Sequence, residues 1–105
     1  MIVIFNKEYL KELYTEGVAS EKKYRFQPQI VAKYIRVISL MQVQKDVVGL
    51  MKYGSLHYEH LHGDKEGLSS VRINDQYRIE FTETVEEGQE IATIVNIEEL
   101  SKHYK

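Results

Sequence analysis

Residues 58–81 place the strongest constraint on the fold, because two turns divide them into three short segments of alternating character. Residues 63–67 begin and end with glycine and predict a tight five-residue turn, and Asn74-Asp75 predicts a two-residue turn of a type that accepts positive φ. Side chains in a strand point to opposite faces with a period of two. The stretch therefore predicts three antiparallel strands with one apolar and one polar sheet face.

Alternation along the three segments assigns each side chain to a face. On the apolar face we expect Leu61, Val71, Ile73, Tyr77, Ile79 and Phe81. On the polar face we expect His60, His62, Arg72, Arg78 and Glu80. An apolar sheet face packs on a core and leaves the other face to solvent. The face with two imidazoles and two guanidiniums is therefore the predicted working surface.

The first half of the chain predicts helices that cover the apolar face. Residues 2–5 form a short apolar strand, and Asn6 is the expected N-cap of a helix that ends in the left-handed conformation at Gly17. Pro28 is suited to the first position of a long amphipathic helix whose apolar residues run to Met41. Residues 44–51 predict a shorter and weaker helix.

The end of the chain completes the predicted sheet. An acidic turn around Gly88, formed by Glu83, Glu86 and Glu87, precedes a strand over residues 90–97, and residues 98–104 are a helical turn or a tail. The element order predicts an α+β fold in a single domain over residues 1–105. In it, a short N-terminal strand is followed by two to three helices packed on one face of an antiparallel sheet of four to five strands.

Charge is distributed unevenly, although the net charge is only −2. Residues 1–53 carry nine Lys/Arg and five Asp/Glu, whereas residues 54–105 carry five and eleven. A basic half can hold a phosphate backbone, or its lysines can simply be the solvated sides of helices. The chain has no cysteine, no apolar run long enough to span a membrane and no leader peptide, so we expect a cytoplasmic protein.

The segment LHGDKEGLSSVRINDQYRIEF resembles the signature of the RelE-superfamily toxins, in the branch called HigB or plasmid-maintenance killer. The turn glycines, the asparagine turn and Tyr77-Arg78-Ile79 occur in the order typical of that branch. The resemblance implies a RelE-like fold and a type II toxin that cleaves mRNA in the ribosomal A site and inhibits translation. It also implies a HigA-like helix-turn-helix antitoxin that represses the operon, so that contact with DNA is only indirect.

Cleavage of RNA without a metal or cofactor needs a base for the 2′-hydroxyl, an acid for the 5′-oxygen and cations for the phosphate. Arg78 matches the strand arginine of the family, and we expect it to stabilise the phosphate, the alternative being an ion pair with Glu80 or Glu59. His60 and His62 are the predicted base and acid, the alternative being two exposed histidines without a role. His62 stands where the family commonly has a lysine.

Further site residues follow from the resemblance. Glu99 fits the acidic residue near the end of the last strand, but Leu100 and Ser101 stand where the branch has tyrosine and histidine. Two C-terminal residues are expected to contribute if the tail folds back, His103 and Tyr104. Phosphate or RNA contacts are expected from Arg72, Lys65, Lys22, Lys23 and Arg25, unless these are solvated surface charges.

Two alternative functions remain beside an active nuclease, and a metal site is also considered. The altered catalytic pattern also fits a catalytically impaired RelE-fold module that acts mainly through antitoxin binding and operon regulation, and an unrelated small-molecule or structural domain is a third possibility. A metal site would have to use His57, Glu59, His60 and His62. Alternation places the first two opposite the last two, and no known ligand spacing is matched, so we expect no metal.

Overall fold

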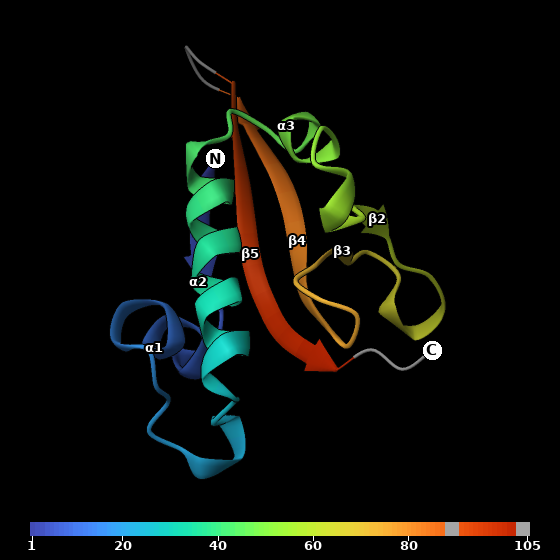
Figure 1. Cartoon of the computed structure of the whole chain (residues 1–105). Helices are drawn as coiled ribbons and strands as arrows, with labels where there is room; N and C mark the ends of the chain where they lie inside the picture. Colours follow the sequence, from blue (N-terminus) through green and yellow to red (C-terminus); the bar gives the residue numbers. More distant parts are fainter. Residues whose placement is uncertain (88–90, 103–105) are drawn as a thin grey trace.

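The computed structural model describes residues 1–87 and 91–102. Within these ranges, two longer helices, α1 and α2, and four short helical segments precede β3 along the chain (Figure 1). They are α1 (Glu8–Glu16), η1 (Lys22–Tyr24), α2 (Pro28–Val43), α3 (Val48–Met51), η2 (Gly54–Leu56) and η3 (Gly63–Lys65). The strands are β1 (Ile2–Phe5), β2 (Glu59–His60), β3 (Ser69–Arg72), β4 (Tyr77–Glu87) and β5 (Ile91–Lys102).

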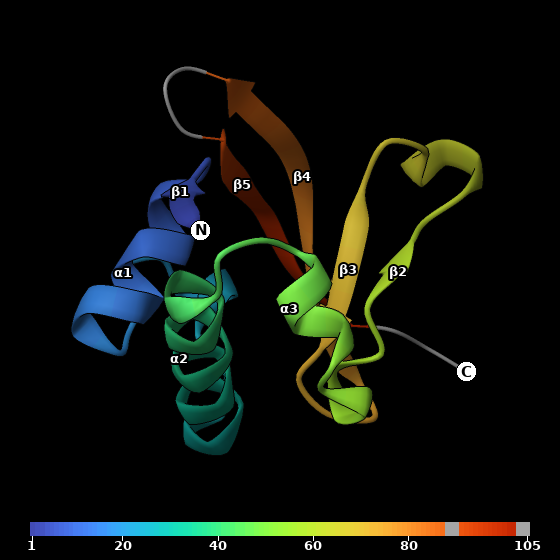
Figure 2. The ribbon, with the colours of Figure 1, turned by 90° about the horizontal axis from the view of Figure 1, so that it is seen from above.

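The five strands form one sheet in the order β1-β5-β4-β3-β2. Strands β2 to β5 are an antiparallel meander, as predicted, whereas β1 pairs with β5 in parallel and makes the sheet mixed. The sheet is curled, with α1 and α2 beside its β1–β5 half and α3 lying between α2 and the β2–β3 edge (Figure 2). This arrangement confirms the predicted α+β fold class.

The core lies between α1, α2 and the predicted apolar sheet face. Val71, Ile79 and Phe81 are fully buried, as expected from their alternation. Among the helical residues, Tyr34 is fully buried and its hydroxyl donates a hydrogen bond of 2.8 Å to the carbonyl of Leu10. That contact ties α2 to α1, and burial raises the pKa of the phenol above its ordinary value.

The boundaries of α1 and α2 follow the predicted signals with one exception. Gly17 caps α1 with a φ of 79°, and Pro28 is the first residue of α2. The N-cap of α1, however, is Lys7 rather than Asn6. The amide of Asn6 instead donates to the carboxylate of Glu98 on β5, so this residue ties the end of β1 to its parallel neighbour.

The structure agrees with the predicted turn over residues 63–67 and corrects the predicted turn at Asn74-Asp75. Gly63 and Gly67 have φ of 73° and 93°, which explains why glycines bracket this turn. The second turn is a three-residue loop over residues 74–76, since Ile73 pairs with Tyr77, and neither Asn74 nor Asp75 has positive φ. It is held by the side chain of Asn74, whose Oδ1 accepts hydrogen bonds from the backbone N–H groups of Gln76 (2.8 Å) and Tyr77 (2.7 Å).

Three further boundaries differ from the sequence prediction. Strand β4 extends to Glu87, so the acidic residues 83, 86 and 87 belong to a strand, and the turn expected around Gly88 lies outside the described residues. Strand β5 extends to Lys102, so residues 98–102 are not a helical turn or tail. Helix α3 covers only Val48–Met51 of the predicted 44–51. The longer strands carry Glu99 and Ser101 alongside the polar face of β4.

Candidate functional site

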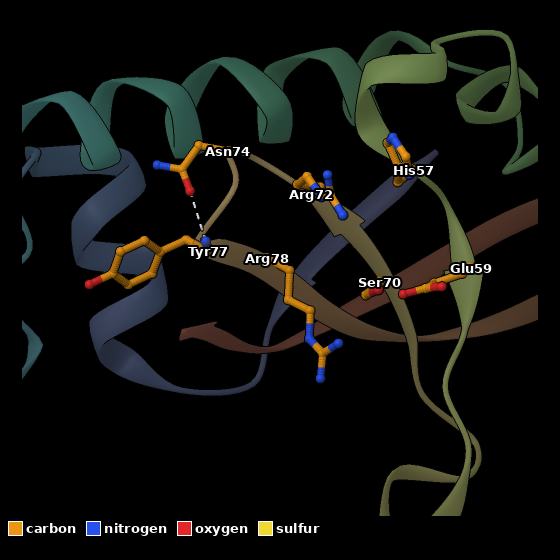
Figure 3. A pocket seen from close by; sticks show the side chains of 7 residues that line it. All are labelled: His57, Glu59, Ser70, Arg72, Asn74, Tyr77 and Arg78. Atoms are coloured by element: carbon orange, nitrogen blue, oxygen red, sulfur yellow. Dashed lines mark hydrogen bonds between the residues drawn. The ribbon is translucent and has the colours of Figure 1, made fainter. Parts of the chain in front are cut away.

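A small pocket of about 50 Å³ opens on the polar face of the sheet, where β2, β3 and β4 lie side by side. Two strand arginines, Arg72 and Arg78, lie at its centre, and His57 and Glu59 reach it from the segment that leads into and forms β2 (Figure 3). Its lining residues are His57, Glu59, Ser70, Arg72, Asn74, Tyr77 and Arg78. Cationic and proton-transferring side chains thus meet in one hollow.

The two arginines are directly opposite each other in the β3–β4 register. Like charges at directly opposed positions of an antiparallel pair destabilise the sheet. Within residues 1–87 and 91–102, Arg72 forms no ion pair that would relieve this repulsion. A bound anion would relieve it, and guanidinium groups are suited to hold phosphate oxygens through paired hydrogen bonds.

A buried carboxylate, Glu80, fixes the orientation of one of these arginines. Only 1% of Glu80 is exposed, and its Oε2 accepts a hydrogen bond of 3.0 Å from Nε of Arg78. The hydroxyl of Ser101 donates to the same oxygen at 2.8 Å. The terminal nitrogens of Arg78 extend beyond this anchor, away from α2 (Figure 3).

Glu80 also brings a second cation to Arg78. The ammonium group of Lys65, from η3, contacts both carboxylate oxygens of Glu80 at 2.8 and 2.7 Å. Burial alone would raise the pKa of Glu80, but hydrogen bonds from Lys65, Ser101 and Arg78 outweigh it and hold that pKa below its ordinary value. One negative charge therefore holds two positive charges together, and the cluster remains electropositive.

The predicted position of His60 on the face of Arg78 is wrong. In the β2–β3 register Glu59 is opposite Ser70, and His60 is opposite Ser69. Ser69 lies on the sheet face that carries the core residues of β3 and β4. The Nδ1 of His60 lies 3.0 Å from the hydroxyl of Ser69, and the ring packs edge-on against Tyr58. His60 is thus on the opposite side of the sheet from Arg72 and Arg78.

His62 is likewise separated from the arginines, because β2 ends at His60 and His62 precedes the turn at η3. Its exposed ring lies 3.5 Å from the carboxylate of Glu66. His60 and His62 line a different hollow, together with Gly67, Glu83 and neighbouring residues. The structure therefore brings the two histidines near each other but not to the pocket of Arg78.

Sequence reasoning missed His57 and Glu59 as site residues. His57 follows η2 and has a φ of 46°, the only positive φ at a non-glycine residue in the part of the chain that is described. Such a conformation is uncommon outside turns and functional sites. His57 and Glu59 are two residues apart, so alternation along the strand places them on one face, opposite to the face of His60 and His62. That spacing is the sequence signal that could have identified them.

Comparison with known proteins identifies the family. The model for the RelE-like toxin of the type II toxin–antitoxin system HigB matches residues 3–97. The chain belongs to the HigB-like toxins. A solved structure of a YoeB/ParE toxin from Agrobacterium tumefaciens is 18% identical, with a TM-score of 0.55 and coverage of 99% of this chain and 100% of that chain, which supports the fold. A search of curated proteins found no match.

Membership of a type II toxin–antitoxin family implies an antitoxin as partner of this HigB-like chain. No helix within the described ranges is long and apolar enough to cross a membrane. Across the same ranges, no three histidine or acidic side chains are grouped so that they would hold a metal ion.

Four other predicted site residues that the structure describes do not line the arginine pocket of the HigB-like chain. Glu99 is opposite Glu80 on β5, and its carboxylate is 4.0 Å from the ammonium of Lys7. The basic residues of η1 are exposed on another part of the molecule, where Lys23 contacts Glu21 at 3.8 Å. The remaining expected contributors are Lys22 and Arg25, which do not line the pocket, and His103 and Tyr104, which lie outside the described residues.

Proposed function

We propose that this HigB-like toxin is a metal-independent endoribonuclease that cleaves mRNA on the ribosome and thereby inhibits translation. The observation that carries the proposal is the opposed pair of Arg72 and Arg78 on one sheet face, with Arg78 anchored by a buried carboxylate. The two opposed guanidiniums, with the ammonium group of Lys65 beside Arg78, carry more positive charge than the Glu80 carboxylate offsets, which suits a phosphate that gains negative charge during cleavage.

In the proposed reaction the ribose 2′-oxygen attacks the adjacent phosphorus, the bond from phosphorus to the 5′-oxygen breaks, and a cyclic 2′,3′-phosphate and a 5′-hydroxyl form. Arg72 and Arg78 hold the non-bridging oxygens. His57 and Glu59 line the same pocket and are the proposed pair for proton transfer. One of them accepts the proton of the 2′-hydroxyl, and the other donates a proton to the leaving 5′-oxygen. Lys65, held beside Arg78 by Glu80, adds positive charge.

The family supports the proposed cellular setting. The toxin acts in the cytoplasm, where translated mRNA is its substrate, and a HigA-like helix-turn-helix antitoxin binds it and represses the operon. Contact with DNA is then made by the antitoxin and not by the toxin. The proposal requires no cofactor, because the arginines supply the charge and the side chains supply the protons.

The test is to induce the toxin alone and to map cleavage of translated messages. Wild-type toxin is expected to arrest growth and cut mRNA, Arg78→Ala to do neither, and Lys11→Ala, which changes an exposed lysine outside the pocket, to behave as wild type. A wild-type toxin that binds its antitoxin but neither arrests growth nor cuts translated mRNA would overturn the nuclease proposal.

That contrary outcome would favour the second candidate, a RelE-fold module that binds antitoxin and regulates its operon without cleaving RNA. One observation supports this candidate: neither His60 nor His62 lines the arginine pocket, and the carboxylate of Glu59 lies there instead. Co-purification with the antitoxin, measured together with cleavage, separates the two candidates.

A further inference from the structure

A second hollow, of about 280 Å³, runs between α2 and the segment from Tyr53 to Leu56. Its floor is apolar, since Val37, Leu56 and Ile73 are buried there. Its rim carries basic side chains from α2 and β3. The lining residues of this groove are Lys33, Arg36, Val37, Leu40, Tyr53, Ser55, Leu56, Arg72 and Ile73.

The charge around the groove has one sign. Lys33 and Arg36 are three residues apart on one face of α2, and Arg72 comes from β3. The lining contains no carboxylate, and within the described ranges none of these three cations forms an ion pair. Three cations gathered without a counter-charge favour a polyanionic occupant.

An aromatic ring stands at the same groove. Tyr53 is 43% exposed, although its neighbour Leu56 is buried, so part of this aromatic residue is accessible to a ligand. Aromatic side chains beside a positively charged groove are the arrangement that holds single-stranded nucleic acid, because bases stack on the rings while cations follow the backbone. The apolar floor between them is suited to a base rather than to a second phosphate.

Arg72 lines both this groove and the pocket that contains Arg78. In Figure 3 its side chain lies toward α2, whereas the guanidinium of Arg78 extends away from the helix. A strand of RNA whose phosphate is held between the two arginines would therefore continue directly into the groove. This continuity favours the same nucleic acid strand as the occupant of the groove.

We propose that the groove between α2 and residues 53–56 is a binding subsite for the single-stranded RNA that flanks the cleaved phosphate. Lys33 and Arg36 bind its backbone, and Tyr53 stacks on one base. The inference rests on the proposed ribonuclease function and extends it, because these three residues bind the strand without touching the reacting atoms.

The test measures binding of a short, fluorescently labelled single-stranded RNA with 2′-O-methyl groups, which cannot be cleaved because the attacking hydroxyl is blocked. Fluorescence anisotropy over a series of salt concentrations gives the affinity and its salt dependence. For Lys33→Gln/Arg36→Gln we expect weaker binding and a slope of log K against log salt that is lower by up to about 1.4, or about 0.7 per lost phosphate contact.

Two matched comparisons define the outcome. Lys11→Gln/Lys45→Gln removes the same charge from exposed positions outside the groove and should change the slope little. Tyr53→Phe keeps the ring and should bind as wild type, whereas Tyr53→Leu should bind about five- to tenfold more weakly. Thermal unfolding of each variant verifies that it is folded.

The proposal is overturned if the groove double variant binds RNA no more weakly than the Lys11/Lys45 control, or if Tyr53→Leu binds as wild type. It is also overturned if RNA binding persists while the antitoxin no longer co-purifies, since the groove would then bind protein. Loss of RNA binding in the variants, together with a wild-type toxin that never cleaves mRNA, would leave the groove supported and the nuclease function refuted.

Discussion

At the scale of single residues, Glu80 determines how the site is arranged. It is buried, it is bonded to both Lys65 and Arg78, and it does not line the arginine pocket. We therefore predict that Glu80→Gln reduces mRNA cleavage by about 10²-fold, because a misdirected guanidinium no longer matches the transition state. Cleavage assays on translated mRNA measure this loss. Glu66→Gln, which removes the exposed carboxylate next to Lys65 in the turn between β2 and β3, should cleave as wild type.

The same carboxylate predicts a dependence of stability on pH. The folded-state pKa of Glu80 is below its ordinary value of about 4.3. Its contribution to the free energy of unfolding is therefore fully present above the ordinary pKa and is lost as the pH falls through the lower, folded-state value. Urea unfolding between pH 7 and the acid limit should show wild type losing more stability than Glu80→Gln. Equal losses would contradict the prediction.

At neutral pH, Glu80→Gln should be less stable than wild type by about 1–3 kcal/mol, the usual effect of losing a charged hydrogen-bond partner in a buried position. The mutation weakens the bonds from Lys65, Arg78 and Ser101 together. Chemical denaturation at pH 7 gives the difference. A variant with wild-type stability and low activity would show that the carboxylate only orients its partners.

The histidines permit a direct comparison between sequence and structure. We predict that His57→Asn lowers cleavage by about 10²-fold, the usual effect of removing a proton-transferring group, whereas His60→Asn/His62→Asn leaves it nearly unchanged. Asparagine is chosen because it tolerates the left-handed conformation of His57. Rate measurements on ribosome-bound mRNA decide between the two pairs. The reverse order of effects would place proton transfer at the sequence-predicted histidines.

At the scale of elements, local sequence signals predicted where helices begin and end and which strand residues are buried. They did not predict the register in which neighbouring strands pair. The helices ending at Gly17 and beginning at Pro28, and the buried face of Val71 and Ile79, depend on residues close together in the sequence. The face of His60 depends on how β2 aligns with β3 across a turn. A shift by one residue moves every side chain to the other face, and alternation within one strand cannot determine it.

The turn that sets this register provides an element-scale prediction. Gly67 has a φ of 93°, where a Cβ is strained even though nothing lies within 4 Å of its position. Gly67→Ala should therefore destabilise the protein by about 1–2 kcal/mol. Gly54→Ala is the control, because its added Cβ also meets nothing within 4 Å but its φ is not positive. Thermal or urea unfolding that finds the two variants equally stable would refute the explanation from backbone strain.

At the scale of the whole molecule, folding brings the two electrically different halves to one surface. The basic α2 belongs to the first half and the arginine strands belong to the acidic second half, yet Lys33, Arg36 and Arg72 line one groove. The sequence left open whether the basic half binds phosphate or is merely solvated. It directed attention to Lys22 and Lys23, because clustering along the chain is visible there, whereas the grouping of α2 with β3 requires the tertiary fold.

This arrangement predicts that binding and chemistry are separable. Lys33→Gln/Arg36→Gln should raise the toxin concentration needed for half-maximal cleavage of ribosome-bound mRNA and leave the maximal rate nearly unchanged, because these residues bind ground and transition states alike. Arg78→Ala, by contrast, should lower the maximal rate below detection at every toxin concentration. Single-turnover cleavage at several toxin concentrations measures each parameter. A fall in maximal rate for the α2 variant would instead place Lys33 or Arg36 at the reacting phosphate.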